Sequence, residues 1–192
     1  MDRAPQIPNL ALSFSSDRRF RMTILTTSRL TLRPPEPGDA DPLYEVFSDP
    51  VAMQFWSTAP HTDPAETRAF VAAMMSLPPG AGEEFVALLD GRVIGKAGFW
   101  QSPEIGFIFH RDTWGQGIAR EAVTAVIDHG FTTRGLDHIT ADVDPRNTGS
   151  IRLLENLGFE ETGRAARTIR IGDDWFDSVY FTLTSATWTD AP

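Results

Sequence analysis

Apolar and polar residues along the chain follow the two periods that are typical of strands and helices. The alternation at Leu30 and Leu32 predicts a short strand, which Pro34 and Pro35 end. Read in this way, the chain has predicted strands at residues 30–32, 85–89, 92–100, 104–109, 139–143, 166–171 and 175–183, and predicted helices after residue 39, from 64, at 117–130 and at 150–157. The order βααβββαβαββ contains antiparallel hairpins and no repeat. It therefore predicts an α/β fold, with one mixed sheet sandwiched by helices.

Two local signals set boundaries within this pattern. Asp63 as N-cap, Pro64 at N1 and Glu66 at N3 form a capping-box arrangement, so a helix is expected to begin at Pro64. Asp90-Gly91 lies between two apolar runs, which is a strong signal for a type I′ turn. Residues 85–100 are therefore expected to form a β-hairpin.

Composition narrows the class of protein. The 192 residues are 41 % hydrophobic and 22 % charged, which suits one globular domain. Acidic residues number 26 against 17 basic ones, for a net charge of −9. Such a surface repels phosphate backbones and anionic lipid, so we expect no nucleic-acid or membrane partner. With no cysteine and four histidines that lack metal-ligand spacing, we expect a cytoplasmic protein without a metal site.

The N-terminal segment differs from the rest of the chain. Its first 21 residues carry four arginines and two aspartates, so they are basic within an acidic protein. Residues 1–21 are expected to be a mobile tail or the product of a start codon assigned too early, with packing against a partner subunit as a third reading. A single domain is expected over residues 22–184, followed by a short tail at 185–192.

The most informative segment runs from Phe107 to Ala122, where a predicted strand passes through a glycine loop into a predicted helix. Gly115 and Gly117 let the backbone approach a ligand closely. The helix start adds free N–H groups and a partial positive charge, which together suit a phosphate. The segment is neither a P-loop nor a dinucleotide fingerprint, because Arg120 occupies the third glycine of the latter. A tight turn that only packs helix on sheet explains the same pattern.

Four segments in the right order resemble the GNAT N-acetyltransferase superfamily, in particular its RimJ/RimL-type branch of ribosomal-protein N-terminal acetyltransferases. Trp114-Gly-Gln-Gly-Ile-Ala119, together with Glu121 and Ala122, resembles the pyrophosphate loop of the family. The other three are Thr27–Arg33, resembling the opening strand, Asn147–Phe159, resembling the second cofactor segment, and Gly172–Asp177 with Tyr180, resembling the closing hairpin. The resemblance covers residues 23–184.

The resemblance implies direct acetyl transfer from acetyl-CoA to an amine in a ternary complex, without a metal or a covalent intermediate. It implies two central parallel strands that splay apart, around residues 107–110 and 141–144, with the thioester between them. A backbone N–H near Phe109 would bind the thioester carbonyl or the pantetheine. The implied cofactor-binding residues are Phe109, His110, Trp114, Gly115, Gln116, Gly117, Ile118, Ala119, Arg120, Asn147 and Ser150.

Transfer to an amine also needs a proton acceptor and a group that stabilises the departing thiolate. Glu104 is the expected base, directly or through water, with Asp142 and His110 as alternatives. Each also has a purely structural interpretation: Glu104 as an exposed carboxylate at a strand end, Asp142 as a residue on the opposite sheet face, and His110 as a residue that packs the loop. Many family members carry a tyrosine acid where this chain has Leu154, so Ser150 is the expected replacement, although helix capping explains it equally well.

The acceptor site is expected to lie between the first third of the chain and the last hairpin. Its candidate aromatic walls are Phe55, Trp56, Trp100, Trp175 and Phe176, of which Trp56 and Trp175 are favoured because they adjoin polar loop residues. An acidic rim of Glu104, Asp173, Asp174 and Asp177 suits a cationic amine.

The resemblance leaves the amine open. A protein N-terminus, a small amine or amino acid and an aminoglycoside-like compound all stay candidates. A non-catalytic acyl-CoA-binding or sensing module is the alternative function, and a regulatory domain without cofactor a more distant one. Dimers are common in this branch, so the resemblance also suggests a homodimer with the closing hairpin as its candidate contact.

Overall fold

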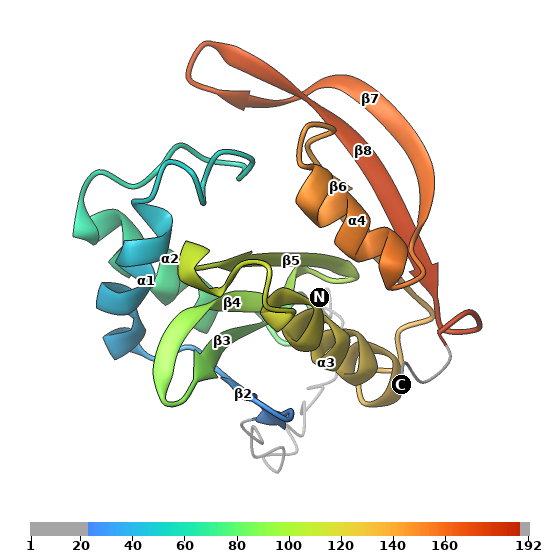
Figure 1. Ribbon diagram of the computed structural model, residues 1–192, viewed down its shortest axis with the longest axis horizontal. Coiled ribbons are helices and arrows are strands. Elements are labelled where there is room, and N and C mark those ends of the chain that lie inside the picture. Colours follow the sequence, from blue (N-terminus) through green and yellow to red (C-terminus); the bar gives the residue numbers. More distant parts are fainter. Residues whose placement is uncertain (1–22, 189–192) are drawn as a thin grey trace, which may run out of the picture.

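The computed structural model describes residues 23–188, which form eight strands and four α-helices around one sheet (Figure 1). The strands are β1 (Leu25–Thr26), β2 (Leu30–Arg33), β3 (Glu83–Leu89), β4 (Arg92–Gln101), β5 (Glu104–Phe109), β6 (His138–Val143), β7 (Glu160–Ile171) and β8 (Asp174–Thr184). The helices are α1 (Ala40–Phe47), α2 (Pro64–Met75), α3 (Ile118–Thr132) and α4 (Thr148–Asn156). The predicted mixed α/β order is confirmed, with β1 added at its start. The predicted tail at 1–21 lies outside the described residues.

The sheet has the order β1-β2-β3-β4-β5-β6-β8-β7 and is antiparallel except between β5 and β6. These two central strands share a single registered pair, Glu104 with Thr140, and then diverge toward their carboxyl ends. The divergence confirms the predicted splay. It leaves backbone groups of both strands free of their usual ladder partners at the place where a ligand is expected.

Strand alternation divides the side chains between two cores. Residues of one face, such as Phe99, Ile105 and Ala141, join the main core with α3 and α4. Residues of the other face, such as Val86 and Ile108, pack with α1 and α2. Because side chains point to opposite faces in turn, Glu104 and Asp142 belong to the α1 and α2 side of the sheet.

The predicted local signals agree with the helix and turn geometry. Asp63 caps α2 by accepting a hydrogen bond from the Ala65 N–H at 2.7 Å, whereas Glu66 bonds to Thr62 rather than closing the predicted box. Asp90 and Gly91 both have positive φ (50° and 80°), as a type I′ turn requires.

The last two strands form a long hairpin that stands beside α4 and extends past the rest of the sheet (Figure 1). β7 starts six residues earlier than predicted, because residues 160–165 contain no alternating apolar residues, whereas Ile169 and Ile171 in its second half do alternate. At the other end of the hairpin, Trp188 donates a hydrogen bond to Asp128 of α3 at 2.7 Å, although the sequence predicts a tail from residue 185. No helix within residues 23–188 is long and apolar enough to cross a membrane.

Candidate active site

Two adjoining cavities lie along β5, and a wall formed by Gln54, Phe55 and Trp56 belongs to both. The first cavity, of about 470 Å³, includes the carboxyl end of β5 from Phe107, the glycine loop and the start of α4. The second cavity, of about 450 Å³, includes the beginning of β5 up to Gly106 and the last hairpin. The change from one cavity to the next therefore occurs between two successive residues of β5.

The glycine loop presents bare backbone to the first cavity. Gly115 and Gly117 have φ of 71° and 75°, a region that side chains disfavour. A Cβ at Gly115 would meet nothing within 4 Å, and one at Gly117 only the end of the Arg29 side chain at 3.5 Å. Ile118 then begins α3, so the free N–H groups and the positive end of a 15-residue helix face the cavity. This arrangement suits an anionic group.

Glu121 anchors the loop to the first strands. It accepts hydrogen bonds from the Thr27 and Ser28 hydroxyls and from the backbone and side chain of Arg29. Burial alone would raise the pKa of Glu121, but the hydrogen bonds from Thr27 and Arg29 lower it to about 2. Arg29 also donates to the carbonyl of Gln116 at 2.9 Å, which fixes the loop just before its second glycine.

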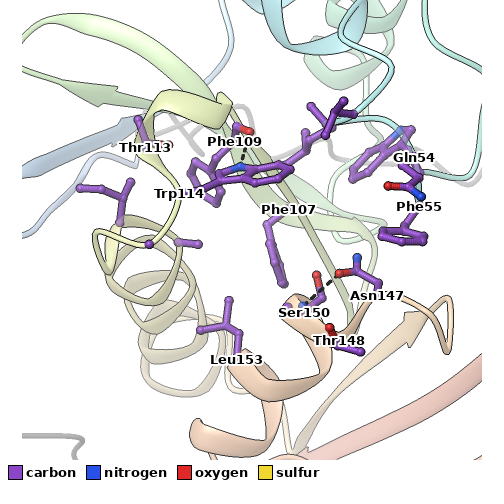
Figure 2. Close-up of a pocket in the computed structure, with 18 of the residues that line it drawn as sticks. Gln54, Phe55, Phe107, Phe109, Thr113, Trp114, Asn147, Thr148, Ser150 and Leu153 are labelled. Carbon is purple, nitrogen blue, oxygen red and sulfur yellow. Dashed lines mark hydrogen bonds between the residues drawn. The ribbon is translucent and has the colours of Figure 1, made fainter.

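Aromatic and polar side chains complete the first cavity (Figure 2). The indole N–H of Trp114 donates to the Phe109 carbonyl at 3.0 Å, so the ring is held over the end of β5 beside Phe107. Across the cavity, the amide oxygen of Asn147 accepts from the Ser150 N–H at 3.1 Å and caps α4. The same cap explains why α4 begins two residues before the predicted start.

The second cavity combines aromatic walls with carboxylates. The walls include Trp56, Phe70, Trp100 and Phe176, and the carboxylates are Glu104, Asp142, Asp144 and Asp177. Phe70 and Trp100 stack with ring centroids 5.7 Å apart. On the sheet, a Cβ at Gly106 would meet only Lys96 Nζ at 3.8 Å, so a missing side chain keeps this part of the cavity open.

The carboxylates differ in their surroundings. Burial raises the pKa of Glu104, and the nearby negative charge of Asp142 raises it further, even though Glu104 is partly open to solvent. Burial also raises the pKa of Asp142, against the effect of the neighbouring Ser178 hydroxyl. Burial would raise the pKa of Asp144 too, but hydrogen bonds from Arg146 at 2.6 and 2.9 Å lower it.

Most of the predicted site residues line one of the cavities. Phe109, Trp114, Gly115, Gly117, Ile118, Ala119, Arg120, Asn147 and Ser150 line the first, Glu104 lines the second, and Trp56 lines both. His110 and Gln116 line neither: the His110 ring accepts from the Asp112 N–H, and the Gln116 side chain donates to the Asp112 carbonyl. Leu154 is fully buried in the main core, so that position does not reach either cavity.

The predicted aromatic and acidic walls need one correction. Trp175, expected in the acceptor site, is 43 % exposed and packs against the Arg167 and Arg170 side chains, outside both cavities. Its neighbour Phe176 lines the second cavity instead, because adjacent residues of a strand point to opposite faces. Of the predicted acidic rim, Asp177 also lines the second cavity, whereas Asp173 in the turn and Asp174 at the start of β8 do not.

A buried ion pair under the second cavity was not predicted. Lys96 Nζ lies 2.8 Å from Glu84 Oε1, with side chains only 2 % and 0 % exposed, and 5.2 Å from the centre of the Trp56 ring. Two charged residues twelve positions apart face each other only after β3 and β4 pair. The available signal was a lysine within the apolar run 92–100 and a glutamate directly before the run 85–89. Within residues 23–188 no three acidic or histidine side chains form a metal-binding cluster.

Residues 29–160 match the family described as acetyltransferase (GNAT) domain. The chain belongs to the GNAT acetyltransferase family. Among its relatives, the uncharacterized N-acetyltransferase p20 of Bacillus licheniformis is 38 % identical over 151 residues, which covers 74 % of this chain and 85 % of that protein. The [ribosomal protein uS5]-alanine N-acetyltransferase of Escherichia coli is 35 % identical over 85 residues, 44 % of each protein.

Solved GNAT structures share the fold. An acetyltransferase of the GNAT family from Bacillus anthracis superposes with a TM-score of 0.74 at 27 % identity, covering 84 % of this chain and 98 % of that one. RimL, the ribosomal L7/L12 α-N-protein acetyltransferase, in complex with coenzyme A, superposes with a TM-score of 0.76 at 19 % identity, covering 84 % and 98 %. Together with the uS5-alanine relative, these matches confirm the resemblance to the RimJ/RimL-type branch.

Proposed function

We propose that this protein transfers an acetyl group from acetyl-CoA directly to a primary amine, with the donor in the first cavity and the amine in the second. One observation carries the proposal: a cavity with a glycine loop and a helix N-terminus adjoins a cavity with carboxylates, and the two meet on β5 between Gly106 and Phe107. A reaction between two bound substrates needs such a junction, because the reacting atoms must meet within one closed space.

The residues of the first cavity fit coenzyme A. The bare backbone at Gly115 and Gly117 and the first turn of α3 would hold the pyrophosphate, with Arg120 adding positive charge. Asn147 and the backbone at Phe109 are suited to the pantetheine amides, and Trp114 would cover the arm. The complex of RimL with coenzyme A supports the same ligand class. When bound, acetyl-CoA supplies an acyl group activated as a thioester.

In the second cavity, Glu104 is proposed to take a proton from the acceptor ammonium, directly or through a water molecule. Its raised pKa makes it a better proton acceptor than an ordinary glutamate. The neutral nitrogen then forms a bond to the thioester carbon as the carbon–sulfur bond breaks. The acetyl group ends on nitrogen, one proton leaves with Glu104, and the second proton, which the nitrogen loses as the amide forms, ends on the departing thiolate.

Ser150 is proposed to relay that second proton from the nitrogen to the departing thiolate, or to donate a hydrogen bond to it. It lines the first cavity from the first turn of α4, whereas Leu154 lies in the core. The acceptor is a protein N-terminal amine or a small amine, since one relative is named for an alanine of ribosomal protein uS5.

Donor binding and turnover test the proposal separately. Acetyl-CoA should raise the melting temperature of the wild-type protein and of Gly135→Trp, but not of Gly117→Trp. Both glycines have positive φ (67° and 75°) and an open Cβ direction, so the two variants carry the same backbone strain, and Gly135 lines neither cavity. An unshifted wild-type protein refutes the donor assignment. A shifted protein that releases no thiol with any amine favours an acyl-CoA-binding module instead.

A further inference from the structure

The side chains around the second cavity include more negative than positive charges. This excess indicates which kind of amine the cavity can bind. Two of its charged residues are neutralised by partners: Lys96 by Glu84 at 2.8 Å, and Asp144 by Arg146 at 2.6 Å. Glu104, Asp142 and Asp177 then remain, and within residues 23–188 none of the three has a basic side chain within ion-pair distance. The side chains that line the cavity thus carry an excess of negative charge.

Within the described part of the chain, Asp142 differs from the other two in having a carboxylate oxygen that is both shielded and unpaired. It is half-buried on β6, two residues beyond the registered partner of Glu104, and it lines the second cavity only. Its Oδ1 is shielded from solvent and finds no hydrogen-bond partner among the described residues. A shielded carboxylate without a cation costs stability, and a bound cation removes that cost.

The reacting nitrogen cannot supply this cation. An amine attacks a thioester only after it loses its proton, so at the moment of reaction it is neutral. A monoamine or a peptide N-terminus would therefore leave the carboxylates uncompensated when the barrier is crossed. A second ammonium on the same molecule keeps its charge throughout.

The walls of the cavity suit the rest of such a molecule. Trp56, Phe70 and Trp100 offer faces that attract ammonium groups and pack against methylenes, and Ile169 and Ile171 of β7 close the opposite side.

We infer that the preferred acceptor is an alkyl diamine or polyamine, whose second ammonium is bound by Asp142 with help from Asp177 at the cavity rim. The inference rests on the proposed function, because it assigns the second cavity to the acceptor. In this arrangement Asp142 is a specificity-determining residue: it selects a dication, while Glu104 takes the proton of the reacting amine.

The experiment compares 1,4-diaminobutane, n-butylamine and a peptide with a free N-terminal alanine by thiol release from acetyl-CoA. The diamine and butylamine share their carbon chain and differ in the second ammonium. We expect kcat/KM for the diamine to exceed that for butylamine by about tenfold or more, as expected for a partly buried ion pair. Asp142→Asn should reduce this ratio to near one, mainly by slowing the diamine. Asp174→Asn, which removes the same charge outside the cavity, should leave the ratio unchanged.

Three outcomes overturn the inference while leaving the acetyltransferase proposal intact. They are equal rates for the diamine and butylamine, a peptide rate above both, or a diamine preference that survives in Asp142→Asn. If acetyl-CoA binds but none of the three amines reacts, the test becomes the thermal shift that 1,4-diaminobutane causes in the presence of CoA. A shift in the wild-type protein that is lost in Asp142→Asn supports the second-ammonium site. The absence of a shift in the wild-type protein refutes it. Failure of acetyl-CoA to bind would refute the proposed function itself.

Discussion

Glu121 offers a test of how the glycine loop is held, because one carboxylate receives hydrogen bonds from three consecutive residues. Its side chain is only 15 % exposed and accepts from Thr27, Ser28 and Arg29. The pKa of Glu121 falls from 4.5 to about 2 in the folded protein. Each pKa unit corresponds to about 1.4 kcal/mol, so ionised Glu121 contributes at most about 3 kcal/mol at neutral pH. Since Arg29 is 43 % exposed, solvent screening reduces the expected contribution to about 2 kcal/mol.

The sign of the pH dependence follows from the lowered pKa. Because the folded pKa lies below the unfolded one, the stabilisation is complete above pH 4.5 and disappears as the pH falls toward 2. Glu121→Gln keeps the shape of the side chain and removes its charge. We therefore expect this variant to lose about 2 kcal/mol of unfolding free energy at pH 7, and less than half as much at pH 3.

Urea denaturation followed by circular dichroism at pH values from 7 to 3 measures this difference directly. Glu155→Gln is the matched control, since Glu155 is an exposed helical glutamate in α4. Its unfolding free energy should stay within about 0.5 kcal/mol of wild type. A loss in Glu121→Gln that does not change with pH, or one no larger than the control at pH 7, would refute the electrostatic account of the loop.

Three further predictions concern the two cavities. The raised pKa of Glu104 means that the folded state favours its protonated form, so ionisation of Glu104 lowers stability at neutral pH. Calorimetry should therefore find a higher Tm for Glu104→Gln than for wild type at pH 7, and no difference in Tm at pH 4. Gly106→Val should fill the second cavity and lower kcat/KM for the amine at least about tenfold, with the acetyl-CoA thermal shift retained, whereas Gly38→Val, also in open space, should change neither. Ser150→Ala should lower kcat about tenfold or more with little effect on acetyl-CoA binding, and an unchanged kcat would remove its proposed role.

Sequence patterns predicted the elements whose signals are local. The Asp90-Gly91 turn, the Asp63 cap and the glycine loop each depend on a few adjacent residues, and each appears in the fold where expected. The first half of β7 was missed because it contains no alternating apolar residues, whereas Ile169 and Ile171 mark the second half. β1, with two residues, is too short to show any period.

The second cavity could be predicted only in part, because its walls come from distant segments of the chain. Trp175 and Phe176 are adjacent aromatics at the start of β8, and no sequence pattern tells which of them faces inward, since a shift of one residue exchanges the faces of a strand. Lys96 and Glu84 likewise become partners only through the register of β3 with β4. Asp142 was correctly expected on the face opposite Ala141, but that face becomes a cavity wall only when the last hairpin lies across it.

The same alternation explains how an acidic protein of charge −9 could accommodate the two proposed substrates, which have opposite charges. The carboxylates Glu104 and Asp142 point to the α1 and α2 side and lie toward the beginning of β5, whereas the glycine loop follows its carboxyl end. From Glu104 to Phe109 the strand extends about 17 Å, at roughly 3.3 Å per residue. This distance weakens the repulsion between the Glu104 carboxylate and a phosphate group at the loop. Near the loop, the positive end of α3 and Arg120 determine the local potential. Net charge thus predicts what the surface as a whole repels, while the position of each charge along β5 determines what each cavity binds.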